Sequence, residues 1–139
     1  MIDLDNTTEF LIDTASLEKI AESLTKKDIE LIVVKNDEIQ ELNKEHRKID
    51  KATDVLSFPM DFDFPNMPLG SIVVSTDFVE EKSKEYGHTF NEEFSLLFIH
   101  GILHLLGYDH EVDNGEHRSK EEELIKEFNL PDSLIVRNS

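Results

Sequence analysis

The amino-acid sequence predicts an α+β domain with a small, mostly parallel four-stranded sheet packed against helices. Segments rich in β-branched residues alternate with segments whose apolar residues recur at helical spacing. The 139 residues suffice for one sizeable core, and no repeat or low-complexity linker divides them. Hydrophobic residues make up 38% and charged residues 32%, a globular balance rather than a disordered one. We therefore expect a single domain over residues 1–139.

The first half of the chain predicts helices and strands in alternation. Apolar residues at helical spacing predict a helix over residues 14–25. The β-branched run IELIVVK predicts a strand over residues 29–35. Asn36 is expected to cap the next helix, which should run over residues 36–48. A second strand, TDVLSF, is expected over residues 53–58 and is closed by a proline.

The second half predicts one more strand and three helices. SIVVS predicts a strand over residues 71–75, and a polar helix should follow it. Thr89 and Glu92 have the spacing of a capping box, which marks the start of the next helix. That helix is apolar nearly all round and ends at Gly107, so it should be buried. A last amphipathic helix is expected over residues 114–128.

The chain is strongly acidic and contains no cysteine. Asp and Glu number 31 against 14 Lys and Arg, for a net charge of −17. This charge argues against a protein that coats nucleic acid non-specifically, because phosphate contacts need clustered cations. The lack of cysteine excludes disulfides, zinc ribbons, iron–sulfur centres and cysteine nucleophiles. No apolar run is long enough to span a bilayer and the N-terminus lacks signal-peptide features, so we expect a cytoplasmic protein with no membrane partner.

Three of the six histidines fall in one short run, HGILHLLGYDH. His100 and His104 stand four residues apart on the expected apolar helix, so their rings lie on one face, one turn apart. Gly107 lets the chain leave the helix in a left-handed conformation, and His110 can then supply a third nitrogen. Three protein ligands leave a fourth position for water, as in catalytic zinc sites. We therefore predict one Zn²⁺ ion, with other divalent metals as alternatives, that activates water near neutral pH.

The residue after the first histidine distinguishes this chain from known metalloproteases. The histidine spacing resembles that of the metzincin metalloproteases, so we expect a metzincin-like metal helix. Those proteases carry a glutamate base directly after the first histidine, whereas this chain has Gly101. Glycine cannot accept a proton. A metal-dependent peptidase therefore remains an alternative function, although the chain lacks the glutamate base that this function would need.

Two further blocks accompany the histidine run. Arg47 precedes the segment TDVLSFP over residues 53–59, and LGSIVVS spans residues 69–75. Together with HGILHLLGYDH, these blocks closely resemble the YbeY family of bacterial endoribonucleases, over about residues 30–128. One position departs from the family pattern, because Ser71 stands where the family usually has aspartate.

The resemblance implies a function and a set of partners. It implies a metal-dependent hydrolase, usually assigned zinc, that cuts single-stranded RNA. It further implies a role in maturing the 3′ end of 16S rRNA and in ribosome quality control. The partners it implies are rRNA, the small ribosomal subunit, a ribosomal protein and a ribosome-associated GTPase.

The resemblance also implies roles for individual residues. His100, His104 and His110 would be the metal ligands, and Arg47 would be the functional arginine of a positively charged groove near the metal. Asp109 lies inside the motif and is expected to be a site residue. It would act as a hydrogen-bond partner of a ligand histidine, as a cap of the turn or as a base.

The densest basic stretch of the chain surrounds Arg47. Lys44, Arg47, Lys48 and Lys51 would form one basic stripe if the helix continues that far. Such a stripe can hold RNA phosphates, with Arg47 offering a bidentate fork. The charge pattern alone favours a solvated helix face paired with nearby glutamates. The resemblance favours the RNA role for Arg47 and leaves the lysines undecided.

Other polar residues have simpler explanations. His46, His88 and His117 lie in polar segments and are expected to be exposed. Tyr108 is expected to pack against the core. A second functional alternative also stays open, namely a non-catalytic ribosome-assembly factor whose metal is structural.

Overall fold

The computed structural model describes residues 1–60, 67–108 and 112–131. Four strands of this part of the chain form one sheet in the order β1-β2-β4-β3. Strand β1 pairs with β2 and β2 with β4 in parallel, whereas β3 and β4 are antiparallel. The strands are β1 (Ile2–Asn6), β2 (Ile29–Val34), β3 (Val55–Pro59) and β4 (Gly70–Ser75). The mostly parallel four-stranded sheet is thus confirmed.

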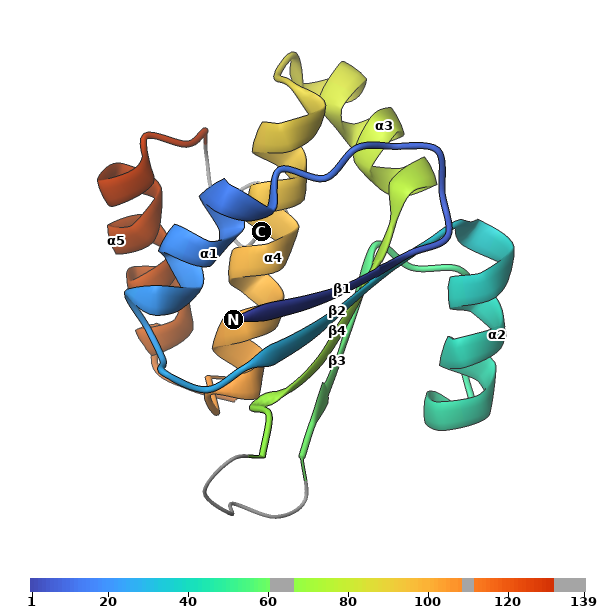
Figure 1. Ribbon diagram of the computed structural model, residues 1–139, viewed down its shortest axis with the longest axis horizontal. Coiled ribbons are helices and arrows are strands. Elements are labelled where there is room, and N and C mark those ends of the chain that lie inside the picture. The colour runs from blue at the N-terminus through green and yellow to red at the C-terminus, as the bar shows by residue number, and fades with distance from the viewer. Residues whose placement is uncertain (61–66, 109–111, 132–139) are drawn as a thin grey trace.

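Five helices of the described residues cover the sheet (Figure 1). They are α1 (Thr14–Glu22), α2 (Asn36–Arg47), α3 (Thr76–Tyr86), α4 (Phe90–Leu105) and α5 (Glu116–Phe128). Helices α1, α4 and α5 lie on one side of the sheet, and α2 lies on the other (Figure 1). Helix α4 packs directly on β3 and β4, and α1, α3 and α5 pack on α4. The helix with the histidine run is therefore the centre of its layer.

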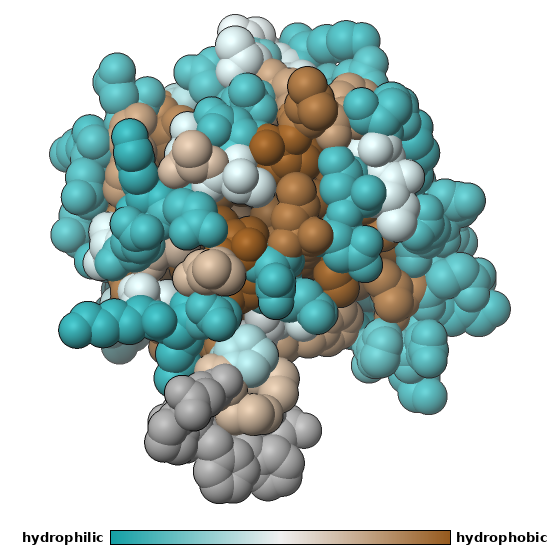
Figure 2. Space-filling model, in the orientation of Figure 1, coloured by the Kyte–Doolittle hydropathy of each residue, from teal (hydrophilic) through white to brown (hydrophobic). Residues whose placement is uncertain are grey.

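The core has two parts because the strands alternate their side chains between the two faces of the sheet. Leu31, Ile72 and Phe98 belong to the larger cluster, which fills the layer around α4. A smaller cluster lies under α2 and consists of Val34, Ile39, Leu56 and Val73. Most of the face in Figure 2 is hydrophilic, in keeping with the net charge of −17.

The boundaries of two helices differ from the prediction. Asn36 is the first residue of α2 rather than its cap, and Lys35 occupies the cap position without a side-chain cap hydrogen bond. The helix ends at Arg47 because Lys48 adopts a left-handed conformation with φ of 60°. The amide of Lys48 donates to the carbonyl of Lys44 at 3.2 Å, the bond of a left-handed helix cap, and the amide of Ile49 donates to the carbonyl of Asn43 at 3.3 Å.

The early end of α2 changes the basic stretch. Lys51 lies outside the helix, so Lys44, Arg47, Lys48 and Lys51 do not form one helical stripe. The idea of a continuous basic helix face is therefore wrong. Among the described residues, no helix is long and apolar enough to cross a membrane.

Candidate metal centre

Helix α4 begins at the capping box that the sequence predicted. The Thr89 hydroxyl accepts a hydrogen bond from the Glu92 amide at 3.1 Å, and the Glu92 carboxylate accepts one from the Thr89 amide at 2.9 Å. These bonds satisfy two amides that a helix start leaves without partners. Beyond the end of α4, Gly107 has φ of 100°, the left-handed conformation expected of it. These two features thus define both ends of the helix that carries His100 and His104.

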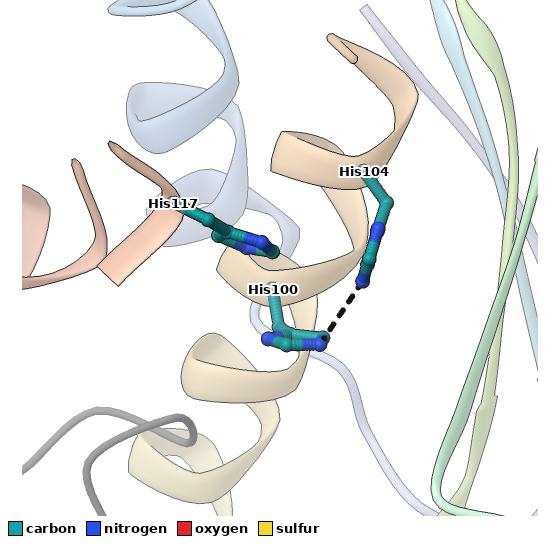
Figure 3. A group of neighbouring side chains, drawn as sticks. All are labelled: His100, His104 and His117. Carbon is teal, nitrogen blue, oxygen red and sulfur yellow. Dashed lines mark hydrogen bonds between the residues drawn. The ribbon is translucent and has the colours of Figure 1, made fainter. Parts of the chain in front are cut away.

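His100 and His104 face each other on α4 as predicted (Figure 3). Their Nε2 atoms lie 3.2 Å apart, and their ring centroids lie 4.8 Å apart. Two nitrogens on one tetrahedral zinc ion, each about 2.0–2.1 Å from the metal, lie about 3.3–3.4 Å from each other. The nitrogen pair in the chain therefore fits a shared metal ion.

A third imidazole joins this pair from α5. His117 lies beside both rings, with centroid distances of 4.8 Å to His100 and 4.9 Å to His104 (Figure 3). One nitrogen of each of the three residues lies within 4.8 Å of the others, a grouping able to hold a metal ion. The prediction that His117 is exposed is wrong, because its side chain is fully buried. Helix α5 packs on α4 and thereby brings the residue into the cluster.

Glu121 connects two of the histidines. Its Oε2 atom lies 2.7 Å from Nδ1 of His100 and 2.9 Å from Nε2 of His117, and its side chain is 1% exposed. Burial raises the pKa of the Glu121 carboxyl, but hydrogen bonds from His100 and His117 outweigh this effect and lower the pKa to about 2. Glu121 is therefore a carboxylate at neutral pH and acts only as an acceptor.

The acceptor role of Glu121 fixes the protons of the neutral rings. His100 must carry its proton on Nδ1 to donate to the carboxylate, which leaves Nε2 as a bare nitrogen. That nitrogen can accept from His104 in the metal-free protein or bind a metal ion. This hydrogen-bonding pattern, a ligand histidine backed by a carboxylate, is typical of metal sites.

Two predicted site residues lie outside the described residues. These are His110, predicted as the third ligand, and Asp109, predicted as a site residue. Their predicted roles stay predictions. Tyr108, the last described residue before them, packs against the core as expected, and its ring lies 6.1 Å from that of His117.

Gly101 faces the sheet rather than the histidines. A Cβ atom at this position would lie 3.0 Å from Cγ2 of Ile72 and 3.3 Å from Oγ of Ser57. The Ser57 hydroxyl also donates to the Gly101 carbonyl at 3.2 Å. A glutamate here would meet the packed sheet, so the chain has no room for the metzincin base at this position.

Arg47 and Ser71 lie on the opposite side of the sheet from the histidines. Arg47 is exposed at the end of α2, the helix that covers the face away from α4 (Figure 1). Ser71 is the neighbour of Ile72 on β4, and since Ile72 faces α4, the Ser71 side chain faces the other side of the sheet. The Ser71 hydroxyl donates a hydrogen bond to the Glu30 carboxylate at 2.8 Å. Helix α4 packs on the edge strand β3 from the side of the histidines.

The two other histidines outside the HGILHLLGYDH run differ in environment. His46 is exposed as predicted, with its ring 5.1 Å from that of Phe58 on β3. The prediction that His88 is exposed is wrong, because its side chain is 9% exposed and Nε2 lies 2.7 Å from the buried Glu93. Sequence reasoning missed Glu93, which lies on the buried helix α4.

The fold and the cluster define an α+β protein with a histidine-based candidate metal centre on a buried helix. A family model described as Endoribonuclease YbeY matches residues 2–129, and the chain belongs to this family. An Endoribonuclease YbeY of Aliarcobacter butzleri is 76% identical over 140 residues, covering 100% of both chains. One of Sulfurimonas denitrificans is 64% identical over 138 residues, covering 99% of each. A solution structure of a Thermotoga maritima protein matches with a TM-score of 0.62 and 33% identity, covering 92% of this chain and 89% of that one.

Proposed function

We propose that this chain is a metal-dependent endoribonuclease that cleaves single-stranded RNA and matures the 3′ end of 16S rRNA. Membership of the endoribonuclease family supports the reaction class. The observation that supports the metal is the pair of Nε2 atoms of His100 and His104, 3.2 Å apart on one face of α4. The ion we expect is Zn²⁺, because imidazole nitrogens in a tetrahedral arrangement suit this metal.

The proposed ligand set has two members that we expect in either case and two candidates for the third. His100 and His104 would hold the ion together, and His117 lies within reach of both. His110, which the sequence predicts as the third ligand, would compete with His117 for that role. Zinc affinity of H110Q and H117Q distinguishes them, since loss of a ligand weakens binding far more than loss of a neighbour.

The bound ion and Arg47 would have different roles in phosphodiester cleavage. A bound divalent ion supplies Lewis-acid chemistry toward a phosphoryl oxygen or a water molecule. Arg47 would bind a phosphate of the RNA and stabilise its developing charge. Because Arg47 and the histidines lie on opposite sides of the sheet, the RNA strand would pass around the edge strand β3.

The attacking group is either a water molecule or the RNA 2′-hydroxyl, and either one must lose a proton. Gly101 cannot accept that proton, so three routes stay open: activation of water by the bound ion itself, Asp109 as the base, and attack by the 2′-hydroxyl after its deprotonation. The product ends decide between attack by water and attack by the 2′-hydroxyl. A cyclic phosphate indicates attack by the 2′-hydroxyl, and a 3′-hydroxyl with a 5′-phosphate excludes it.

Binding of free RNA should be weak, because the net charge is −17. We therefore propose that the chain acts in the cytoplasm on RNA presented by the small ribosomal subunit. A ribosomal protein and a ribosome-associated GTPase would be the partners that deliver the substrate. Cleavage of rRNA in subunits should then exceed cleavage of the same RNA when free.

The peptidase and the non-catalytic assembly factor are less well supported. The family name describes an endoribonuclease, and position 101 packs against the sheet. Protein cleavage that disappears on chelation would favour the peptidase. A structural metal predicts that H104A unfolds the domain and that the intact protein cleaves nothing.

The test is cleavage of a single-stranded RNA that carries the 16S rRNA 3′ precursor end, with zinc-loaded protein. Wild type is compared with H104A and R47A, each shown to be folded by circular dichroism. R118A is the matched control, because Arg118 is an exposed arginine of α5 that pairs with Glu122. Cleavage by wild type and R118A, lost in H104A and R47A, is expected. No cleavage of free RNA or of 30S and 70S particles would refute the proposal.

A further inference from the structure

Helix α5 places one carboxylate against two histidines of the candidate metal centre. Glu121 and His117 stand four residues apart on α5, so they share one face of the helix. Both side chains are buried, at 1% and 0% exposure. Across the helix interface, Nδ1 of His100 lies 2.7 Å from the same carboxylate oxygen that contacts His117.

Because Oε2 of Glu121 contacts both His100 and His117, the carboxylate constrains the orientation of both rings. His100 cannot turn its ring over without losing its hydrogen bond to Oε2, because the flip would exchange Nδ1 with the carbon Cδ2, which would then face the carboxylate. His117 stacks on His100, with the ring centroids 4.8 Å apart and the two ring planes 26° apart. The carboxylate thus holds Nε2 of His100 toward His104.

We propose that Glu121 is the positioning residue of the metal centre. It fixes the Nδ1–H tautomer of His100 and holds the His117 ring against it, so that Nε2 of His100 faces the metal. This inference rests on the proposed function, because it assigns Glu121 a role at the same site. It holds for either choice of third ligand. Loss of such a supporting group weakens metal binding about 10- to 100-fold in comparable sites.

The matched pair of variants is E121Q and E122Q. Both make the same change on the same helix, but Glu122 is 48% exposed and pairs with Arg118. The amide of E121Q keeps the shape of the side chain and one acceptor oxygen while removing the charge. Zinc affinity is measured by competition with a chromogenic chelator. We expect E121Q to bind zinc 10- to 100-fold more weakly than wild type and E122Q to bind it equally well.

A second measurement tests the tautomer directly and needs no metal and no RNA. Nitrogen-15 spectra of the histidine rings in the metal-free wild type should show His100 protonated on Nδ1. In E121Q a population protonated on Nε2 should appear. At saturating zinc, E121Q should lower kcat for RNA cleavage and leave KM for the RNA unchanged.

The outcomes separate this inference from the proposed function. E121Q with wild-type zinc affinity overturns the positioning role and leaves the endoribonuclease proposal intact. His100 protonated on Nε2 in wild type overturns it even if E121Q fails to fold. A wild type that binds no divalent metal overturns the metal centre, and the positioning role with it.

Discussion

The packing of Gly101 on α4 against the sheet yields a prediction whose sign is set by two opposing effects. Gly101 lies in the interior of α4, where alanine is favoured over glycine by about 1 kcal/mol. The new Cβ would lie 3.0 Å from Cγ2 and 3.4 Å from Cδ1 of Ile72, and 3.3 Å from Oγ of Ser57. Ile72 is fully buried and Ser57 is hydrogen-bonded to the carbonyl of Gly101, so neither neighbour moves freely.

Overpacking of a well-packed core costs about 1–3 kcal/mol. Set against a helix gain of about 1 kcal/mol, this cost leaves G101A about 1 kcal/mol less stable than wild type. Truncating the neighbour should reverse the sign. I72A alone costs about 2–5 kcal/mol, but in its background the methyl of G101A has room and only the helix gain remains.

A double-mutant cycle of G101A and I72A measures this effect. Urea unfolding of the metal-free chains, followed by circular dichroism, gives the four free energies of unfolding. We expect G101A to destabilise wild type by about 1 kcal/mol and to stabilise I72A by about 1 kcal/mol, a coupling of about 2 kcal/mol. The reasoning is refuted if G101A stabilises both backgrounds equally, because Gly101 would then not be required by the approach of helix and sheet.

Three further predictions concern the start of α4 and the metal. T89A should lower the free energy of unfolding by about 1 kcal/mol through loss of the cap, measured by urea unfolding against S95A on the same helix. The hydrogen bond from the Thr89 amide lowers the pKa of Glu92 in the folded state, so its stabilising effect is present above the ordinary value of 4.5 and is lost as pH falls through the folded pKa. The stability difference between wild type and E92Q should therefore shrink from pH 7 to pH 3. Zinc at 100 times its dissociation constant should stabilise wild type by about 2.7 kcal/mol, a gain that chelation reverses and H104A lacks in thermal unfolding scans.

The sequence predicts the two central strands and the edge strand β3, but it gives no range for the other edge strand, β1. Runs of β-branched residues locate β2 and β4, because these central strands are largely buried. Strand β1 has no such run and had no predicted range of its own. Its residues are mostly exposed apart from Ile2, and it is a strand because it pairs in parallel with β2. That pairing is a non-local contact, which local pattern does not contain.

The position at which α2 ends also could not be predicted from the type of residue found there. Left-handed helix ends are usually glycine or asparagine, whose backbones adopt positive φ at low cost. Here the position is Lys48, with φ of 60°, although lysine is a good helix former. The buried Asn43 compensates, because its side chain donates to the Lys51 carbonyl at 3.0 Å and holds the returning chain. A basic stripe read along the sequence therefore continues past the real end of the helix.

The candidate metal centre shows why a residue pattern can be correct for one helix and misleading for the next. The spacing of His100 and His104 predicts their shared face, and the structure confirms it. The segment with His117 is rich in charged residues, a composition that predicts exposure to solvent, whereas the His117 side chain is buried.

The sequence of α5 nevertheless contains a pattern of residues at helical spacing that indicates a buried face. The buried positions of that helix are His117, Glu121 and Leu124, which form one stripe of the kind that faces a core. Two of the three are ionisable, and burying such groups is costly unless each finds a polar partner. His117 and Glu121 contact each other within α5, and α4, which packs on α5, adds His100 as a second partner of Glu121. An ionisable pair on the apolar stripe of one helix, opposite a histidine pair on another, thus predicts a shared site.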